Sequence, residues 1–174
     1  LCPAEVSTNM ARFDGVRFGL QGDTAWHDRI HDYYAAIRSQ WFGDEVKRRI
    51  LTGAYVLSAG FYDAYYRKAV GVRNQMRAQC NALFWQYDAI IGPTVPVLPW
   101  KIGSNIDPVQ EYLLDLCTIP ANLTGTPAMS VPCGFAEIDG KKLPIGFQIM
   151  TKYRDEATMF GVARVVERMG REEK

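Results

Sequence analysis

The segment AMSVPCGFAEIDGKKLPIGFQIM, residues 128–150, carries the pattern that decides the fold. It begins with a short apolar run at 128–131 and ends with a second run at 143–150, and both are typical of buried β-strands. Between them stands Asp139-Gly140, a dipeptide that supplies the positive φ angles of a tight turn. The segment therefore predicts two strands joined as a β-hairpin.

The flanking sequence predicts a third strand and several helices. The apolar run 89–91 is closed by Gly92-Pro93, as expected for a buried strand that ends in a loop. Asp107-Pro108 is a helix start, and that helix must stop before Pro120. Apolar spacing of three and four residues predicts further helices over 28–41, 44–58, 61–83 and 155–169. Strands and helices in this order indicate an α/β fold with a sheet covered by helices.

Composition places the chain among ordinary globular proteins. It has 174 residues, of which 48% are hydrophobic and 22% charged, and a formal net charge of +1. A chain with so little net charge has no overall attraction for nucleic acid or for an anionic membrane. The charge-free runs 81–86 and 89–100 are well short of the roughly 20 apolar residues that a membrane span needs. We expect a soluble protein.

The cysteines and the first residues bear on cellular context. Cys2, Cys80, Cys117 and Cys133 form no C-x-x-C pair or other metal-binding spacing. We expect reduced core thiols in a cytoplasmic protein. The chain opens on Leu1 with no signal-type apolar stretch, so we expect it to come from the inside of a longer protein.

Two histidines and two serines are the first candidates for chemistry, and the sequence favours neither pair. His27 and His31 are four residues apart, but no third histidine completes a zinc site. We predict exposed histidines and no metal. Ser130 lies in an apolar strand without the flanks of a nucleophile elbow, and Ser58 falls inside a predicted helix. Both serines are interpreted as structural.

Arg49 differs from the other basic residues of its predicted helix. At 100° per residue it falls near the apolar arc of Val46 and Gly53, whereas Arg48 faces water. An arginine turned inward needs an anion. The helical phase leaves two alternatives open, which are a structural salt bridge and a clamp for an anionic ligand.

Asp115 raises the matching question for an acidic side chain. It is the one acid in a largely apolar turn, 112–117. Isolated acids in such places are usually paired or hydrogen-bonded to nearby backbone. The residues alone therefore favour a structural role for Asp115.

Several stretches together resemble one family, and they follow each other in the family's order along nearly the whole chain. They are residues 11–19, 43–50, 60–66 and 87–96, and 127–132 together with 143–148. The chain resembles the A subunit of the glutamyl-tRNA(Gln)/aspartyl-tRNA(Asn) amidotransferases, a branch of the amidase signature family.

The resemblance implies a fold and a position within it. Residues 1–174 would be the C-terminal portion of a single amidase-type domain, whose mixed central sheet is covered by helices. The family's Ser, cis-Ser, Lys triad belongs to the portion that precedes this one. The resemblance thus implies no catalytic residue in this chain, which we expect to be inactive alone.

The resemblance also implies a substrate pocket. Arg49 and Asp115 match the family's glutamine-binding arginine and aspartate, and the Thr-x-Pro-x-Asn stretch 118–122 follows Asp115. An arginine fork suits the α-carboxylate of glutamine, and a carboxylate suits its ammonium group. A tyrosine that completes the family's pocket would lie upstream of Leu1.

The implied function is that of an amidase within a cytoplasmic ligase. Glutamine hydrolysis would supply ammonia for transamidation of misacylated Glu-tRNA(Gln) or Asp-tRNA(Asn), with the B and C subunits of the amidotransferase as partners. The chain itself would bind no cofactor, whereas ATP and Mg²⁺ are implied for the partner subunit. Two alternatives stay open: a stand-alone amidase acting on another small amide, and a non-catalytic scaffold that docks partners through the basic face 47–77.

Overall fold

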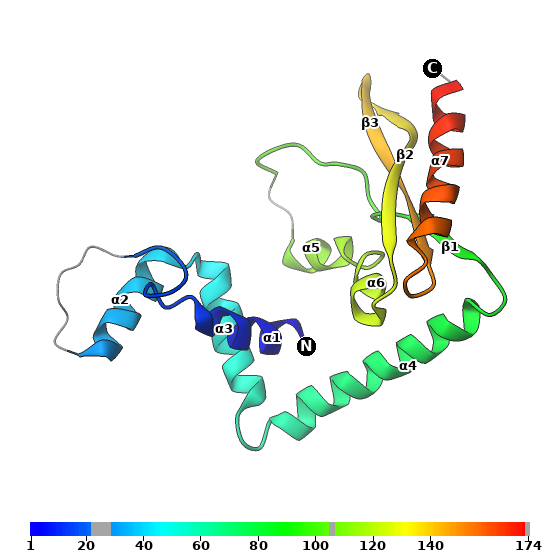
Figure 1. The fold of residues 1–174 in the computed structure, drawn as a ribbon. Helices are drawn as coiled ribbons and strands as arrows, with labels where there is room; N and C mark the ends of the chain where they lie inside the picture. Colours follow the sequence, from blue (N-terminus) through cyan, green and yellow to red (C-terminus); the bar gives the residue numbers. More distant parts are fainter. Residues whose placement is uncertain (22–28, 105–106, 173–174) are drawn as a thin grey trace. The chain divides into compact units, whose positions relative to one another are not determined.

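The computed structural model describes residues 1–21, 29–104 and 107–172 (Figure 1). They form two compact units, Leu1–Val72 and Arg73–Lys174, and the boundary falls inside helix α4. That both units belong to one amidase-type domain stays a prediction.

The first unit is helical. It contains α1 (Cys2–Asn9), the short 3-10 helix η1 (Met10–Arg12), α2 (Ile30–Trp41), α3 (Asp44–Leu57), the π-helical turn η2 (Tyr62–Arg67) and the start of α4 (Lys68–Leu83). The helices predicted over 28–41 and 44–58 are confirmed in the described residues, whereas α1 was not predicted. The helix predicted over 61–83 begins with the π-helical turn, where Phe61 stacks on Tyr65 and Tyr62 lies against Tyr66.

The end of α3 corrects one expectation about a serine. Ser58 is not inside a helix, because α3 ends at Leu57 and Ser58 is its C-cap. The Ser58 hydroxyl donates to the Tyr55 carbonyl at 2.7 Å. A hydroxyl engaged in closing a helix fits the structural interpretation.

Helices α1 and α3 pack closely because small residues face each other. Ala4 of α1 is 3% exposed, and Gly53 is the buried residue of α3. A Cβ atom added at Gly53 would lie 2.0 Å from the carbonyl oxygen of Pro3. No side chain fits in that space, so a glycine at this position allows the two backbones to approach.

We expect Gly53→Ala to destabilise the protein by about 1–3 kcal/mol, because the new methyl group must push α1 off α3. Gly71→Ala is the matched control. Gly71 lies in α4 with open space around its Cβ position, so alanine should stabilise that helix by up to about 1 kcal/mol. Urea unfolding of both variants measures the difference. Equal stability of the two would contradict the packing described for Gly53.

The second unit is built on a three-stranded sheet with the order β1-β3-β2. Its strands are β1 (Ala89–Pro93), β2 (Ala128–Ile138) and β3 (Lys141–Thr151). Asp139 and Gly140 have φ angles of 53° and 71° in the turn between β2 and β3, which confirms the predicted hairpin. The α/β class is confirmed too, although both strand pairings of the described residues are antiparallel rather than mixed.

Strand β2 is longer than the run 128–131 from which it was predicted. It continues past Pro132 through an irregularity in the register between Pro132 and Gly134. A bulge at the sheet edge tolerates proline, which cannot donate a ladder hydrogen bond. In the described sheet β2 is an edge strand, so Pro132 does not end it.

Helix α7 (Glu156–Glu172) covers one face of β2 and β3, as Figure 1 shows. The core between them consists of Val131, Ile149, Met159 and Ala163, with Val162 and Val166 packed against it. The helix predicted over 155–169 and its apolar face are therefore confirmed. This packing fixes β3 as the rigid centre of the unit.

Two short helices lie between β1 and β2. Helix α5 (Pro108–Leu114) begins with the predicted proline and stops before Pro120. Helix α6 (Ile119–Thr124) was not predicted, and it carries Pro120 in its first turn and Gly125 at its C-cap with a φ of 76°. Proline is tolerated in a first turn because its missing N–H has no partner there.

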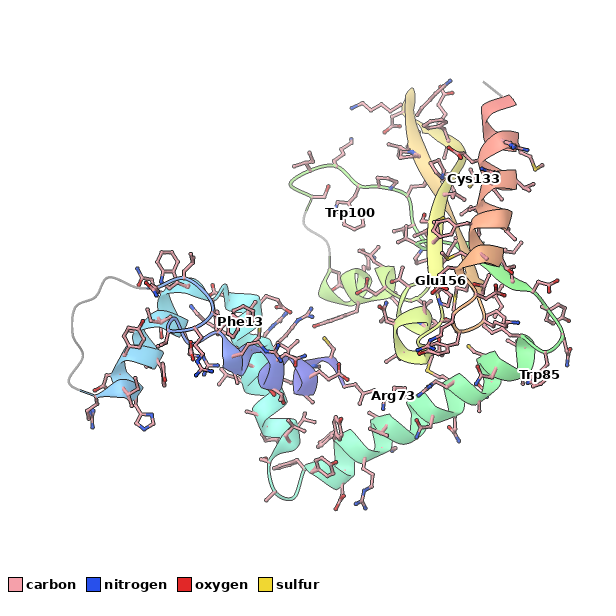
Figure 2. All side chains as sticks on the ribbon, viewed as in Figure 1. Phe13, Arg73, Trp85, Trp100, Cys133 and Glu156 are labelled. Carbon is pink, nitrogen blue, oxygen red and sulfur yellow. The ribbon has the colours of Figure 1, made fainter. Side chains whose placement is uncertain are left out.

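The cysteines are not core residues. All four are free thiols, but Cys2 is exposed and the other three are half-buried. Cys133, labelled in Figure 2, lies in the irregular part of β2. Their apolar character suggested burial, whereas the described structure places them at the margins of each unit.

Candidate functional site

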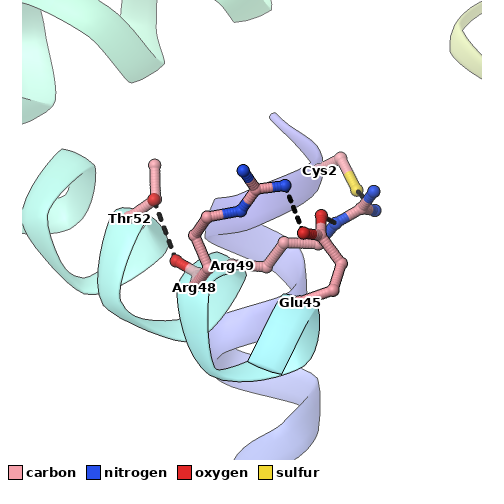
Figure 3. Close-up of polar contacts among 5 residues, drawn as sticks. All are labelled: Cys2, Glu45, Arg48, Arg49 and Thr52. Atoms are coloured by element: carbon pink, nitrogen blue, oxygen red, sulfur yellow. Dashed lines mark hydrogen bonds and ion pairs between the residues drawn. The ribbon is translucent and has the colours of Figure 1, made fainter. Parts of the chain in front are cut away.

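Arg49 lies on α3 in a cluster of charged side chains (Figure 3). Its Nε atom donates to Oε1 of Glu45, one turn earlier, at 2.7 Å. Arg48 donates to the other oxygen of the same carboxylate. The Arg49 guanidinium also contacts the Cys2 sulfur of α1 at 3.5 Å. One carboxylate therefore serves two arginines.

The contacts in this cluster favour the charged forms of Glu45 and Arg49. The hydrogen bond from Arg49, followed by that from Arg48, holds the pKa of Glu45 below its ordinary value. The same contact with Glu45 raises the pKa of Arg49. Because two guanidinium groups share the single negative charge of Glu45, positive charge remains available to another anion.

The helical phase predicted for Arg49 and Arg48 agrees with their positions. Arg49 is on the side of α3 that meets α1, and its side chain is 46% exposed against 64% for Arg48. Arg49 is half exposed rather than buried, so its guanidinium remains accessible. Glu45 is the internal carboxylate that the structural alternative required, and the exposure of Arg49 leaves the ligand alternative open as well.

Asp115 lies in the turn between α5 and α6, and its surroundings differ from those predicted. The residue is exposed, and its carboxylate makes no hydrogen bond or ion pair to the residues that the structure describes. Its main-chain carbonyl instead accepts from the Thr118 amide at 3.1 Å and from the Ile119 amide at 2.9 Å. The backbone of the turn is held by these bonds, whereas a partner for the Asp115 carboxylate stays a prediction.

A polar hollow of about 330 Å³ lies beside this turn. Its polar lining comes from the turn, from α6 and the loop after it, from strands β2 and β3 and from the residue after β1. It comprises Thr94, Thr118, Asn122, Thr126, Ser130 and Gln148. Gln148 is 8% exposed, and its Nε2 donates to the Cys117 carbonyl at 2.8 Å. The hollow offers hydrogen-bonding groups, which suit a small polar ligand.

The hydroxyls of Thr94 and Ser130 meet across the sheet at 2.5 Å. Gly146 makes room for them, because a Cβ there would lie 2.7 Å from Thr94 Oγ1 and 2.8 Å from Ser130 Oγ. Ser130 thus has a structural partner, as predicted. A glycine inside an apolar strand is the sequence signal for such a close approach.

Arg49 and Asp115 belong to different units. The structure describes the surroundings of each within its own unit, so their joint contribution to one pocket stays a prediction. Ser130 and Gln148 share the second unit with Asp115. Sequence analysis did not single out Gln148, although a polar residue in the apolar run 143–150 is the signal that could have found it.

The histidines offer little to a metal. His31 is exposed on α2, and His27 lies outside the described residues. In the ranges 1–21, 29–104 and 107–172, no three His, Cys, Asp or Glu side chains gather as a metal site would require. Nor does any helix in these ranges have the length and apolar character to cross a membrane.

The fold and this site define an α/β protein with a polar small-molecule hollow beside a hairpin sheet. The family model described as Amidase matches residues 1–160. The chain belongs to the Amidase family.

Individual members of the family can be compared with this chain. The chain is 49% identical over 168 residues to the glutamyl-tRNA(Gln) amidotransferase A subunit of Brevibacillus brevis, a match that covers 96% of this chain and 33% of the relative. It is 50% identical to the protein of the same name from Shouchella clausii, a match that covers 97% of this chain and 34% of that protein. The chain therefore spans about a third of the length of these curated relatives.

Solved structures support the same fold. The crystal structure of the glutamyl-tRNA(Gln) amidotransferase A subunit from Thermotoga maritima is 41% identical, with a TM-score of 0.57, over 79% of this chain and 30% of that one. A bacterial aryl acylamidase of the amidase signature family superposes with a TM-score of 0.60 over 95% of this chain and 31% of its own. At 21% identity, that second likeness concerns the fold alone.

Proposed function

We propose that this chain is part of the A subunit of a glutamyl-tRNA(Gln) amidotransferase and supplies the groups that recognise free glutamine. The identity of about half over nearly the whole chain supports the assignment. Large exposed apolar side chains fit a portion of a larger domain, for example Trp85 at 89% exposure after α4 (Figure 2) and Leu51 at 72%.

The observation that carries the proposal is the Asp115 carboxylate, which has no partner among the described residues and stands on a fixed backbone. Such a carboxylate suits the α-ammonium group of an amino acid, and Thr118 of the same turn lines the polar hollow. Arg49 is charged and half exposed, and its planar fork suits the α-carboxylate of the same ligand. Glutamine carries both charges, so the two residues select it over uncharged amides.

The amide chemistry belongs to the family's Ser, cis-Ser, Lys triad, which this chain is proposed not to contain. In that reaction the activated serine attacks the side-chain carbonyl of glutamine, and the C–N bond breaks with release of ammonia. Water then hydrolyses the acyl-enzyme to glutamate. This chain's part is to hold the α-carbon end of the substrate so that the amide meets the serine.

The complete enzyme would have the B and C subunits as partners and would pass the ammonia to the partner subunit that holds misacylated Glu-tRNA(Gln) or Asp-tRNA(Asn). ATP and Mg²⁺ would be bound by the partner subunit rather than by this chain. We place the complex in the cytoplasm.

Neither alternative has comparable support. A stand-alone amidase acting on another small amide would use the charges of Arg49 and Asp115 only if that amide carried a carboxylate and an ammonium group. In the basic face 47–77, Lys47 and Arg67 pair with Asp44 and Asp63, and Arg48 and Arg49 share Glu45, which lowers the positive charge of the face without removing it. These pairs weaken the basic face 47–77 as an anchor for nucleic acid.

The proposal is tested by measuring ammonia release from glutamine. The complete subunit that carries this chain should release ammonia and form glutamate, whereas residues 1–174 alone should not, because the nucleophile is missing. Release by residues 1–174 that is lost in Ser130→Ala would place the nucleophile in this chain and contradict the proposal.

A further inference from the structure

Resting on the proposed function, we propose that Gln148 is a positioning residue that holds Asp115 in place for the ammonium group of glutamine. The side chain of Gln148 is the described link between the Asp115 turn and the central strand of the sheet. Its role would be to fix the position of the Asp115 carboxylate.

The platform under Gln148 is rigid. It lies on β3, the middle strand, opposite Gly92 of β1 and Ser130 of β2. The next residue, Ile149, is fully buried under α7. A side chain that starts from such a position has little freedom, because backbone and neighbours are fixed on both sides.

The link reaches the turn that carries Asp115. Gln148 Nε2 donates to the Cys117 carbonyl at 2.8 Å, two residues after Asp115. Within the turn, the Asp115 carbonyl accepts from the Thr118 amide, the Thr118 hydroxyl and the Ile119 amide. These bonds tie the turn together, and the amide of Gln148 connects it to the sheet.

Losing this bond has a specific expected consequence. Gln148 is 8% exposed, so water cannot simply replace its amide at the Cys117 carbonyl. The turn that carries Asp115 would be displaced, whereas the sheet and the protein groups that bind other parts of the substrate would stay in place. Displacement of a binding group by about 1 Å is enough to reduce its contribution strongly.

The experiment tests the complete subunit with four amides that differ only in their charges. Glutamine carries both α-groups, 4-aminobutanamide only the ammonium, glutaramic acid only the carboxylate, and butyramide neither. In Gln148→Met, which cannot donate to Cys117, the KM for glutamine and for 4-aminobutanamide should rise about tenfold. The KM for glutaramic acid and kcat for butyramide should stay within about twofold.

A second variant and a control distinguish displacement of Asp115 from a general loss of stability. Gln148→Glu keeps the shape but sets an acceptor against the Cys117 carbonyl. Its added negative charge would attract an ammonium, so weaker ammonium binding in this variant reports displacement of Asp115. Thr151→Val is the control, because Thr151 is fully buried on the same strand and its hydroxyl donates to the Asp155 carbonyl at 2.8 Å. It should affect all four amides equally.

The outcomes are distinguishable. If both Gln148 variants affect the four amides equally, as Thr151→Val does, or leave all four unchanged, the positioning role is overturned. If Asp115→Asn weakens ammonium binding and the Gln148 variants do not, this inference fails while the proposed function stands. If Asp115→Asn also shows no preference for the ammonium substrates, the proposed function itself fails.

Discussion

Arg49→Ala in the complete subunit is expected to raise the KM for glutamine by about tenfold to a hundredfold. A hydrogen bond to a charged group contributes roughly 1.5–3 kcal/mol, and each 1.4 kcal/mol is a factor of about ten in affinity. The kcat for butyramide should change little, because the amide is handled by other groups. Steady-state kinetics of ammonia release with both substrates measures the effect.

Arg48→Ala is the matched control for Arg49→Ala. Both arginines pair with Glu45, but Arg48 is the more exposed of the two. Exposed ion pairs contribute about 0–1 kcal/mol, so neither variant should unfold the protein. If Arg48→Ala were the damaging change and Arg49→Ala the silent one, the glutamine-binding arginine would be Arg48, and our choice of Arg49 would be wrong by one residue.

Asp115→Asn is expected to weaken glutamine binding by a similar factor, again about tenfold to a hundredfold in KM. The substitution keeps the shape of the side chain and removes only its charge. The loss should appear with glutamine and 4-aminobutanamide but not with glutaramic acid, which lacks the ammonium group. If Asp115→Asn unfolded the protein without changing its substrate preference, Asp115 would stabilise the fold rather than bind glutamine.

The hairpin was the most predictable part of the fold, because its signals are local. Asp139 and Gly140 adopt the positive φ angles that their residue types favour. The spacing of Met159 and Ala163 likewise predicted the face of α7 that reaches the core. Local propensity and tertiary packing agree at these positions.

Elements that depend on packing were harder to predict. Helix α1 has a weak apolar pattern and is held by its approach to Gly53, a contact between residues far apart in sequence. Helix α6 is six residues long, too short for periodicity to show. The continuation of β2 past Pro132 depends on a bulge, which the proline conceals.

The candidate site was predictable in part. Helical phase indicated which of two adjacent arginines approaches the neighbouring helix. The apolar residues around Asp115 suggested a paired acid, but neighbouring apolar residues such as Leu116, 61% exposed, do not enclose it. Gln148 was missed because its hydrogen-bond partner, Cys117, lies 31 residues away, and the local pattern marks only a polar residue within an apolar run.

The central claim is that this chain recognises the two charges at the α-carbon of glutamine. Its most direct test is kcat/KM of the complete subunit for glutamine, glutaramic acid, 4-aminobutanamide and butyramide. We predict that removing either charge lowers kcat/KM by about tenfold or more, and that butyramide, without both, is the poorest substrate. Equal kcat/KM for glutamine and butyramide would contradict the claim.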